Sequence, residues 1–160
     1  MPNYWLDADS LIQTKNGPYG FDIAPSFWLF IEQKMNEGIL SSSIMVFSEL
    51  ENGDEDDLLI WARQQKENGH FSEPDAIVQT IFRQIATYVN QNYPQFQASA
   101  FLNGADPWLI AHAIAYGGRV VTFEVPAPSS NKPKIPDIAA QFDILTLNIY
   151  QMVRELRIVL

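Results

Sequence analysis

The chain has 160 residues, of which 47% are hydrophobic and 18% charged, a composition typical of one compact globular domain rather than a disordered segment. It contains no cysteine, which excludes disulfides and thiolate zinc sites. Its net charge of −9 argues against a protein that binds nucleic acid mainly through a basic surface. The same charge is compatible with acids that surround a metal ion, and with an acidic surface that meets a basic partner.

The chain also lacks membrane and export signals. No apolar run approaches the roughly 18 residues that a membrane span needs. The start, Met-Pro-Asn-Tyr-Trp-Leu-Asp, has neither the basic region nor the apolar region of a signal peptide. We therefore expect a cytoplasmic protein that forms a single domain over residues 1–160, without an internal repeat or a long linker.

The first quarter of the chain predicts a strand followed by two helices. Tyr4–Leu6 is a short apolar run typical of a buried strand, and a helix is expected to start near Asp9 or Ser10, both of which are good cap residues. The segment 16–20 (Asn-Gly-Pro-Tyr-Gly) breaks that helix. A second helix is predicted over Pro25–Asn36, with proline at its start and glycine just beyond its end.

The middle of the chain predicts one short strand and three helices. Ile39–Leu40 indicates a strand, and the serines 41–43 are expected to cap a helix that carries Glu49. The next helix is predicted over Asp54–Asn68, where the acidic first turn favours the helix dipole. Asp75–Asn92 has a single apolar stripe at helical spacing, which indicates core packing.

The last third of the chain predicts a loop after Pro94, a helix over Asp106–Tyr116 and a strand over Arg119–Phe123. A loop rich in proline and serine follows over 125–133. The remaining expected elements are a helical turn near Pro136–Ala140, a short strand over Asp143–Leu145 and a final helix. Strands separated by helices predict an α/β protein of three layers, α/β/α, with a central and mainly parallel sheet.

Four acidic residues stand at the ends of apolar runs: Asp7, Glu49, Asp106 and Glu124. In parallel sheets, ligands bind beyond the carboxyl ends of the strands, and Asp7 and Glu124 directly follow two predicted strands. Carboxylates that converge repel one another unless they hold a cation. The pattern therefore indicates a metal-dependent site.

The acids near predicted helix starts also have a simpler structural explanation. One of Asp7, Asp9 and Ser10 is needed merely to cap the first helix. Asp106 followed by Pro107 is typical of a helix cap and the first helical residue. Capping and function are compatible, because a capping carboxylate can also point into a site.

The remaining polar candidates are weaker when they are considered singly. Glu49 on a helix is typical of a solvated surface residue, and Glu124 is typical of a loop that leaves a strand. Thr122 adds a hydroxyl that can fix a carboxylate or a water. His112 is interpreted as a packing residue, and His70, in a turn, is given no role.

Four segments together resemble the PIN-domain superfamily of metal-dependent nucleases, which includes the VapC-type ribonuclease toxins. The matching segments, in the family's order and spacing, are Tyr4–Ile12, Ser43–Gly53, Ala105–Ala113 and Gly118–Glu124. Glu124 stands where the family more usually has Asp. The aromatic loop Gly17–Phe21 also resembles an uncharacterised PIN-like subgroup of prokaryotic proteins. The resemblance extends over nearly the whole chain.

The resemblance implies a PIN-like fold and hydrolysis of phosphodiesters with one or two Mg²⁺ or Mn²⁺ ions, which suit all-oxygen ligands. The implied catalytic metal ligands are Asp7, Glu49, Asp106 and Glu124, with Asp9 as a further ligand. Ser10 and Thr122 would hold the carboxylates or a water. The implied partners are an RNA substrate, an antitoxin protein that covers the acidic pocket, and a second copy of the chain in a homodimer.

Two alternatives remain open. Asp7 and Asp9 after a strand also resemble the first motif of haloacid-dehalogenase-type phosphatases, with Asp7 as nucleophile, and Thr122 and Lys132 would serve as later motifs. That reading needs a further acidic motif, for which Asp137 is a poor substitute. The other alternative is a catalytically silent PIN-like module that binds a protein partner through its acidic surface.

Overall fold

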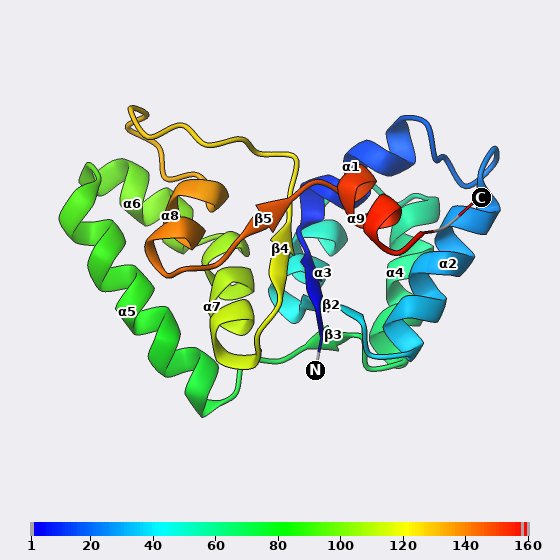
Figure 1. Cartoon of the computed structure of the whole chain (residues 1–160), viewed down its shortest axis with the longest axis horizontal. Coiled ribbons are helices and arrows are strands. Elements are labelled where there is room, and N and C mark those ends of the chain that lie inside the picture. The colour runs from blue at the N-terminus through cyan, green and yellow to red at the C-terminus, as the bar shows by residue number, and fades with distance from the viewer. Residues whose placement is uncertain (1, 158, 160) are drawn as a thin grey trace.

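The computed structural model describes residues 2–157 and residue 159, and its centre is a five-stranded sheet in the order β3-β2-β1-β4-β5 (Figure 1). All four neighbouring pairs of strands run parallel. The strands are β1 Tyr4–Leu6, β2 Leu40–Ser43, β3 Phe71–Ser72, β4 Arg119–Val121 and β5 Thr146–Leu147. Every residue of β1 is buried, as expected for the central strand of a parallel sheet that helices cover on both faces.

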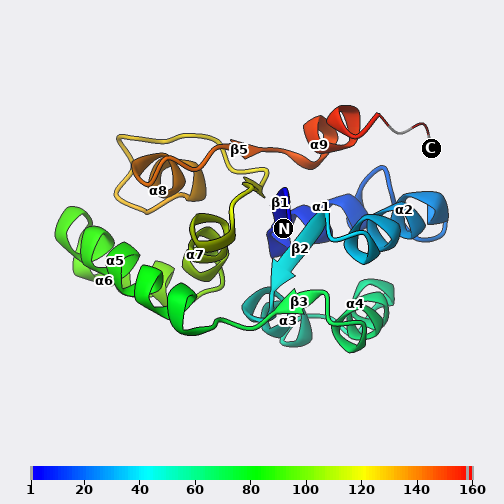
Figure 2. The ribbon, with the colours of Figure 1, turned by 60° about the horizontal axis from the view of Figure 1, so that its bottom comes forward.

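Helices flank the sheet on two sides. They are α1 Ala8–Asn16, α2 Pro25–Asn36, α3 Ile44–Glu51, α4 Asp57–Glu67, α5 Ala76–Asn92, α6 Gln95–Leu102, α7 Asp106–Tyr116, α8 Ile135–Gln141 and α9 Ile149–Glu155. Figures 1 and 2 both place α5, α6, α7 and α8 on one side of the sheet and α1, α2, α4 and α9 on the other. The predicted α/β/α layering is therefore confirmed. Within the described residues, no helix combines the length and the apolar character that a membrane span requires.

Helix α7 covers the middle of the sheet, where it packs against β1, β2 and β4. Its buried face includes Leu109, Ile110 and Ala113, and α5 packs against its other side. The chain enters β4 through two glycines with positive φ, and a side chain at Gly118 would meet the backbone oxygen of Pro2 at 2.8 Å. This close approach lets β4 lie directly beside β1.

Several predicted elements have the expected bounds in the structure. The strand Tyr4–Leu6 and the helices Pro25–Asn36 and Asp106–Tyr116 are present as predicted. Ser43 caps α3 by accepting a hydrogen bond from the amide of Met45, as expected for the serine run. The predicted mainly parallel sheet is parallel at every described pairing.

Other predictions were wrong, each for a local reason. Helix α1 begins at Ala8, so its cap is Asp7 and not Asp9 or Ser10. The segment after Pro94, expected to be a loop, contains helix α6, which buries only Ala98 and so shows no apolar stripe. The strand expected over 143–145 lies at Thr146–Leu147, because Asp143 adopts a left-handed turn with a φ of 61°. Strand β3, at two residues, is too short to show a pattern.

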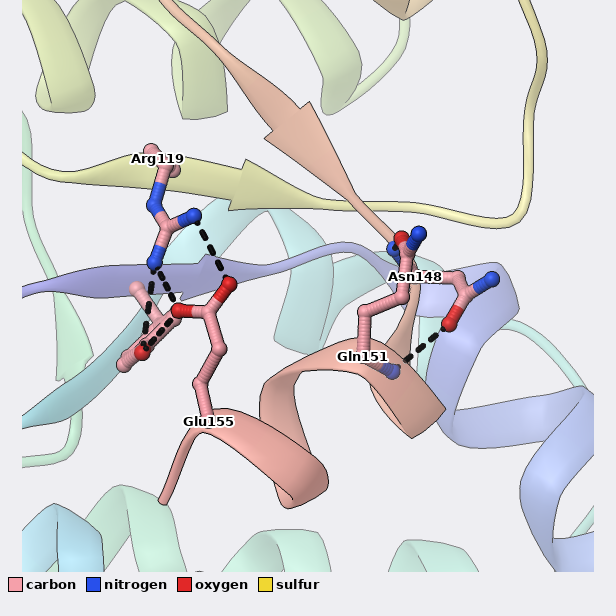
Figure 3. Close-up of polar contacts among 5 residues, drawn as sticks. Arg119, Asn148, Gln151 and Glu155 are labelled. Carbon is pink, nitrogen blue, oxygen red and sulfur yellow. Dashed lines mark hydrogen bonds and ion pairs between the residues drawn. The ribbon is translucent and has the colours of Figure 1, made fainter. Parts of the chain in front are cut away.

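Polar contacts fasten the last helix to the amino ends of β1 and β4 (Figure 3). The hydroxyl of Tyr4 donates to the carboxylate of Glu155 at 2.8 Å, and Arg119 forms an ion pair with the same carboxylate. Asn148 and Gln151 form a reciprocal capping box at the start of α9. The contacts of Glu155 lie at the amino ends of β1 and β4, opposite the carboxyl edge of the sheet, whereas the capping box directly follows β5.

Candidate functional site

The four acids of the predicted site come from different elements around the carboxyl edge of the sheet. Asp7 directly follows β1, Glu124 is the third residue after β4, Asp106 begins α7 and Glu49 lies in α3. Leu6 pairs with Val121, so the residues that leave β1 and β4 emerge side by side. The backbone amide of Asp7 continues this pairing by donating to the carbonyl of Val121 at 3.1 Å.

Asp7 is the most buried of these acids, with 2% of its surface exposed. Its Oδ1 accepts a hydrogen bond from the amide of Ser10 at 2.7 Å and thereby caps α1. Burial raises the pKa of Asp7 to about 6, although hydrogen bonds from Ser10 and Thr122 pull this pKa downward. The capping explanation thus holds for Asp7, and its burial gives the same carboxyl a perturbed titration.

The hydroxyl residues beside Asp7 are both buried. Ser10 donates through Oγ to the carbonyl of Val121 at 3.2 Å, and Thr122 forms a side-chain hydrogen bond with Asp7. Thr122 Oγ1 also accepts from the amide of Glu124 at 3.1 Å. Thr122 therefore forms a hydrogen bond with the side chain of Asp7 and another with the backbone amide of Glu124. Asp9, in contrast, is exposed, and its carboxylate accepts a hydrogen bond from Gln13.

Asp106 is not a helix cap, which corrects the prediction. The cap position of α7 belongs to Ala105, whose backbone is already helical with φ −78° and ψ −26° and whose own side chain makes no cap bond. Asp106 is the first helical residue and Pro107 the second. Among the described residues, no hydrogen bond to the Asp106 carboxylate is found. Helix capping therefore does not explain why an aspartate stands at position 106.

The electrostatics around Asp106 show that the acids gather there. Its pKa is raised to about 8, first by burial and then by the negative charges of neighbouring carboxylates. Those carboxylates belong to Asp7, Glu124, Glu49 and Asp9. Acids from three other segments of the chain therefore act on this one carboxyl group. The sequence pattern predicted that the acids meet at the carboxyl edge, and a metal site formed by them stays a prediction.

Glu49 reaches the site from an exposed position on α3. Its Oε1 accepts a hydrogen bond from the backbone amide of Ala105 at 2.8 Å, next to Asp106. A side chain at Gly104 would lie 3.3 Å from the same oxygen, so glycine leaves room for this approach. Sequence reasoning gave Gly104 no role, and the only signal was a glycine just before the Ala105–Asp106 segment.

Glu124 is anchored in a similar way. Its Oε1 accepts a hydrogen bond from the amide of Ile135 at 2.8 Å, the first residue of α8. That helix has no side-chain cap from its own cap residue, Lys134, so Glu124 supplies an acceptor in its place. One oxygen of Glu124 is thus engaged, and a second carboxylate oxygen stays available for another ligand.

The carboxylates share one electrostatic field but do not form a complete metal-binding shell. Among the residues that the structure describes, no group of three or more acidic or histidine side chains is arranged to hold a metal ion. The chemistry of the set nevertheless fits a hard divalent cation, because every candidate donor is a carboxylate oxygen. A bound cation would also offset the repulsion between carboxylates, which contributes to the raised pKa of Asp106.

The two histidines and the later acid of the phosphatase alternative have structural contacts of their own. His112 is buried and stacked on Trp5 with ring centroids 5.0 Å apart, as a packing residue. Neither of its ring nitrogens has a hydrogen-bond partner within the described part of the chain. His70 bonds to Asn36 at 2.7 Å. Asp137, the later acid of the phosphatase alternative, holds the loop amide of Ala127 at 2.9 Å.

Comparison with known families and structures supports the fold. Residues 4–160 match the family model described as Domain of unknown function (DUF4411). The chain belongs to this family. No curated protein matches it. This member of the family has the α/β architecture described above.

A solved structure extends the comparison beyond the family. The crystal structure of VapBC2 from Rickettsia felis, bound to a DNA fragment from their promoter, aligns with 91% of this chain and 96% of its own, with a TM-score of 0.52 and 14% identity. At this identity the likeness concerns the fold alone. The PIN-like fold expected from the four sequence segments is confirmed by this likeness.

Proposed function

We propose that residues 1–160 form a single PIN-like unit that acts as a metal-dependent endoribonuclease. The observation that carries this proposal is the position of the four acids around the carboxyl edge of the sheet, where burial first, and then the charges of neighbouring carboxylates, raise the pKa of Asp106. A structural role accounts for single acids, but such repulsion costs stability and is retained where a cation or a substrate uses it. The PIN-like fold, shared with the VapBC2 structure, supports the same reading.

The proposed roles follow the contacts of each residue. The catalytic acids that would hold Mg²⁺ or Mn²⁺ are Asp7, Glu49, Asp106 and Glu124, with Asp9 at the exposed margin. A bound cation would supply a water of lowered pKa and neutralise the charge that develops on the phosphodiester. Thr122 would orient Asp7 and the chain leading to Glu124, and Ser10 would fix the first turn of α1 against β4.

The proposal includes protein partners. We call the four acids at the carboxyl edge of the sheet, Asp7, Glu49, Asp106 and Glu124, the acidic edge. This edge and the net charge of −9 suit a basic segment of a second protein that would cover the carboxylates and inhibit the enzyme. By analogy with VapBC2, that partner would be an antitoxin, and the chain would be the toxin of the pair. Association of two copies as a homodimer belongs to the same analogy, and light scattering of the purified protein tests it.

The decisive experiment compares the parent with Asp7→Asn on labelled RNA and single-stranded DNA, with Mg²⁺, Mn²⁺ or EDTA. Asparagine caps helices as well as aspartate, so the amide of Ser10 keeps its acceptor while the charge is lost. We expect metal-dependent cleavage of RNA by the parent and at least about a hundredfold loss in the variant. Asp143→Asn, an exposed acid in a turn, is the matched control and should cleave normally.

The same assay separates the alternatives. A silent binding module is favoured by one observation, the lack of an assembled metal shell among the described residues. If the parent cleaves neither nucleic acid and its melting temperature does not change with Mg²⁺ or Mn²⁺, the nuclease proposal is wrong. A catalytically silent binding module is then the better explanation. Hydrolysis of a phosphate monoester that depends on Asp7 would instead support the phosphatase.

A further inference from the structure

Asp106 also lines a groove of 410 Å³, together with residues of α6 and of the segment before α8. Helix α6 forms one wall with the aromatic residues Phe96 and Phe101. The opposite wall is the end of the loop before α8, with Lys132 and Lys134. The groove thus combines aromatic rings, two cations and one carboxyl of the proposed catalytic set.

The aromatic wall is unusual because its outer ring is not covered. Phe96 has 80% of its surface exposed, more than any other exposed aromatic or aliphatic side chain within residues 2–157. Leaving a phenyl ring in water forfeits the free energy that burial would give. An exposed ring beside a groove is typical of a surface that stacks on a ligand.

The basic wall is unusual in a chain with a net charge of −9. Four of its basic residues form ion pairs with acids, namely Lys15, Lys34, Arg63 and Arg119. Lys132 and Lys134 form no ion pair with any described residue. Two lysines within three positions, on the rim of a groove that begins at an acidic centre, are therefore available to an anion.

We propose that this groove binds a single-stranded nucleic acid and leads it to the acidic edge, an inference that rests on the proposed nuclease function. Lys132 and Lys134 pair with successive phosphates, and Phe96 stacks on an unpaired base. The site needs this attraction because the carboxylates around Asp106 repel phosphates. Stacking on Phe96 requires an unpaired base, so the groove selects single strands over duplexes.

Binding is measured by fluorescence anisotropy with short labelled single strands of RNA and of DNA in EDTA, where metal-dependent cleavage does not occur. Lys132→Gln combined with Lys134→Gln should lower the slope of log Kd against log salt by about 1.4, since each phosphate contact on a single strand contributes about 0.7. Phe96→Ala should weaken binding by about 5-fold to 150-fold, and Phe96→Trp should preserve it.

Matched controls separate the groove from general charge and apolar effects. Lys66→Gln combined with Arg83→Gln removes the same charge from exposed positions on α4 and α5 and should leave the salt slope unchanged. Ile77→Ala removes another exposed apolar side chain and should bind like the parent. Lys134 is half-buried and the other substituted side chains are exposed, so circular dichroism of each variant should show unchanged folding.

The outcomes distinguish this proposal from the nuclease itself. The groove is supported if its variants lose affinity for either nucleic acid, and a preference for RNA or DNA then identifies the natural strand. The groove is overturned if the parent does not bind a single strand, as a protein-binding groove would behave, or if groove and control variants bind alike. If cleavage depends on Asp7 but is unchanged by substitution of Phe96 and the two lysines, the nuclease proposal is supported and the groove proposal is wrong.

Discussion

The carboxylate of Glu49 accepts a hydrogen bond from the backbone amide of Ala105, 2.8 Å away, and so fastens helix α3 to the residue before Asp106. Glu49 and Ala105 are distant in sequence, and neither position alone indicates this contact. The bond fixes the approach of α7 to the acidic edge, and it leaves one oxygen of Glu49 for another ligand. Glu49 therefore combines a structural bond with a charge, and substitutions can separate the two.

Glu49→Gln keeps an oxygen acceptor for the Ala105 amide but removes the negative charge near Asp106. We expect a melting temperature close to that of the parent and at least about a tenfold loss of metal-dependent cleavage. Glu49→Ala, which also breaks the bond, should lower both stability and activity. Glu51→Gln, an exposed neighbour on the same helix, should change neither. Full activity of Glu49→Gln in cleavage assays would remove Glu49 from the site.

Asp106→Asn should stabilise the metal-free protein. The pKa of Asp106 is raised to about 8 from its usual 3.8, so the folded state prefers the protonated form. Its contribution to stability is complete below pH 3.8 and is lost as the pH rises through about 8. Asparagine is neutral throughout, so the melting temperature of the variant in EDTA should exceed that of the parent by an amount that grows toward pH 8.

The same variant should respond less to metal. Cations that bind only the folded protein raise the melting temperature of the parent, by about 2–4 °C for each kcal/mol of binding free energy. Asp106→Asn removes a proposed ligand and should lose most of this rise with Mg²⁺ or Mn²⁺. An equal rise in parent and variant, measured by differential scanning fluorimetry, would show that Asp106 is not a metal ligand.

At Glu124, too, substitutions can distinguish the role of a hydrogen bond from that of the negative charge, because its carboxylate accepts a hydrogen bond from the first amide of α8. Glu124→Ala should destabilise the fold by about 1 kcal/mol, the usual cost of a lost helix cap, as measured by urea unfolding. Glu124→Gln should retain that stability and still lose cleavage. If Glu124→Gln cleaves as fast as the parent, the charge at this position is dispensable, and Glu124 acts only as the acceptor for α8.

His112 should make the protein less stable in mild acid. Burial lowers its pKa to about 4 from the usual 6.5, so folding favours the neutral ring. Stability is unaffected above pH 6.5 and declines as the pH falls toward about 4, by on the order of 3 kcal/mol. His112→Phe keeps a ring against Trp5 and should remove this decline. The prediction is contradicted if the urea concentration at the unfolding midpoint changes by the same amount in parent and variant between pH 7 and pH 5.

The sequence was sufficient for the architecture and for the position of Asp7, because short apolar strands and helical stripes carry their own periodicity. It was sufficient for Glu49 only through the register of the family segments, since an exposed helical glutamate carries no local signal. The cap at α7 was misassigned because cap identity depends on backbone angles, and Ala105 is already helical. The groove between Phe96 and Lys132 depends on tertiary packing, which no local pattern records.

The central strand β1 and its partner β4 lie far apart in the sequence, since Tyr4 pairs with Arg119. Such long-range pairing is slow to form. Asp7 and Glu124 follow these two strands, so their relative position depends on this late pairing. The proposed site would therefore assemble only near the end of folding, and a partly folded chain would lack it.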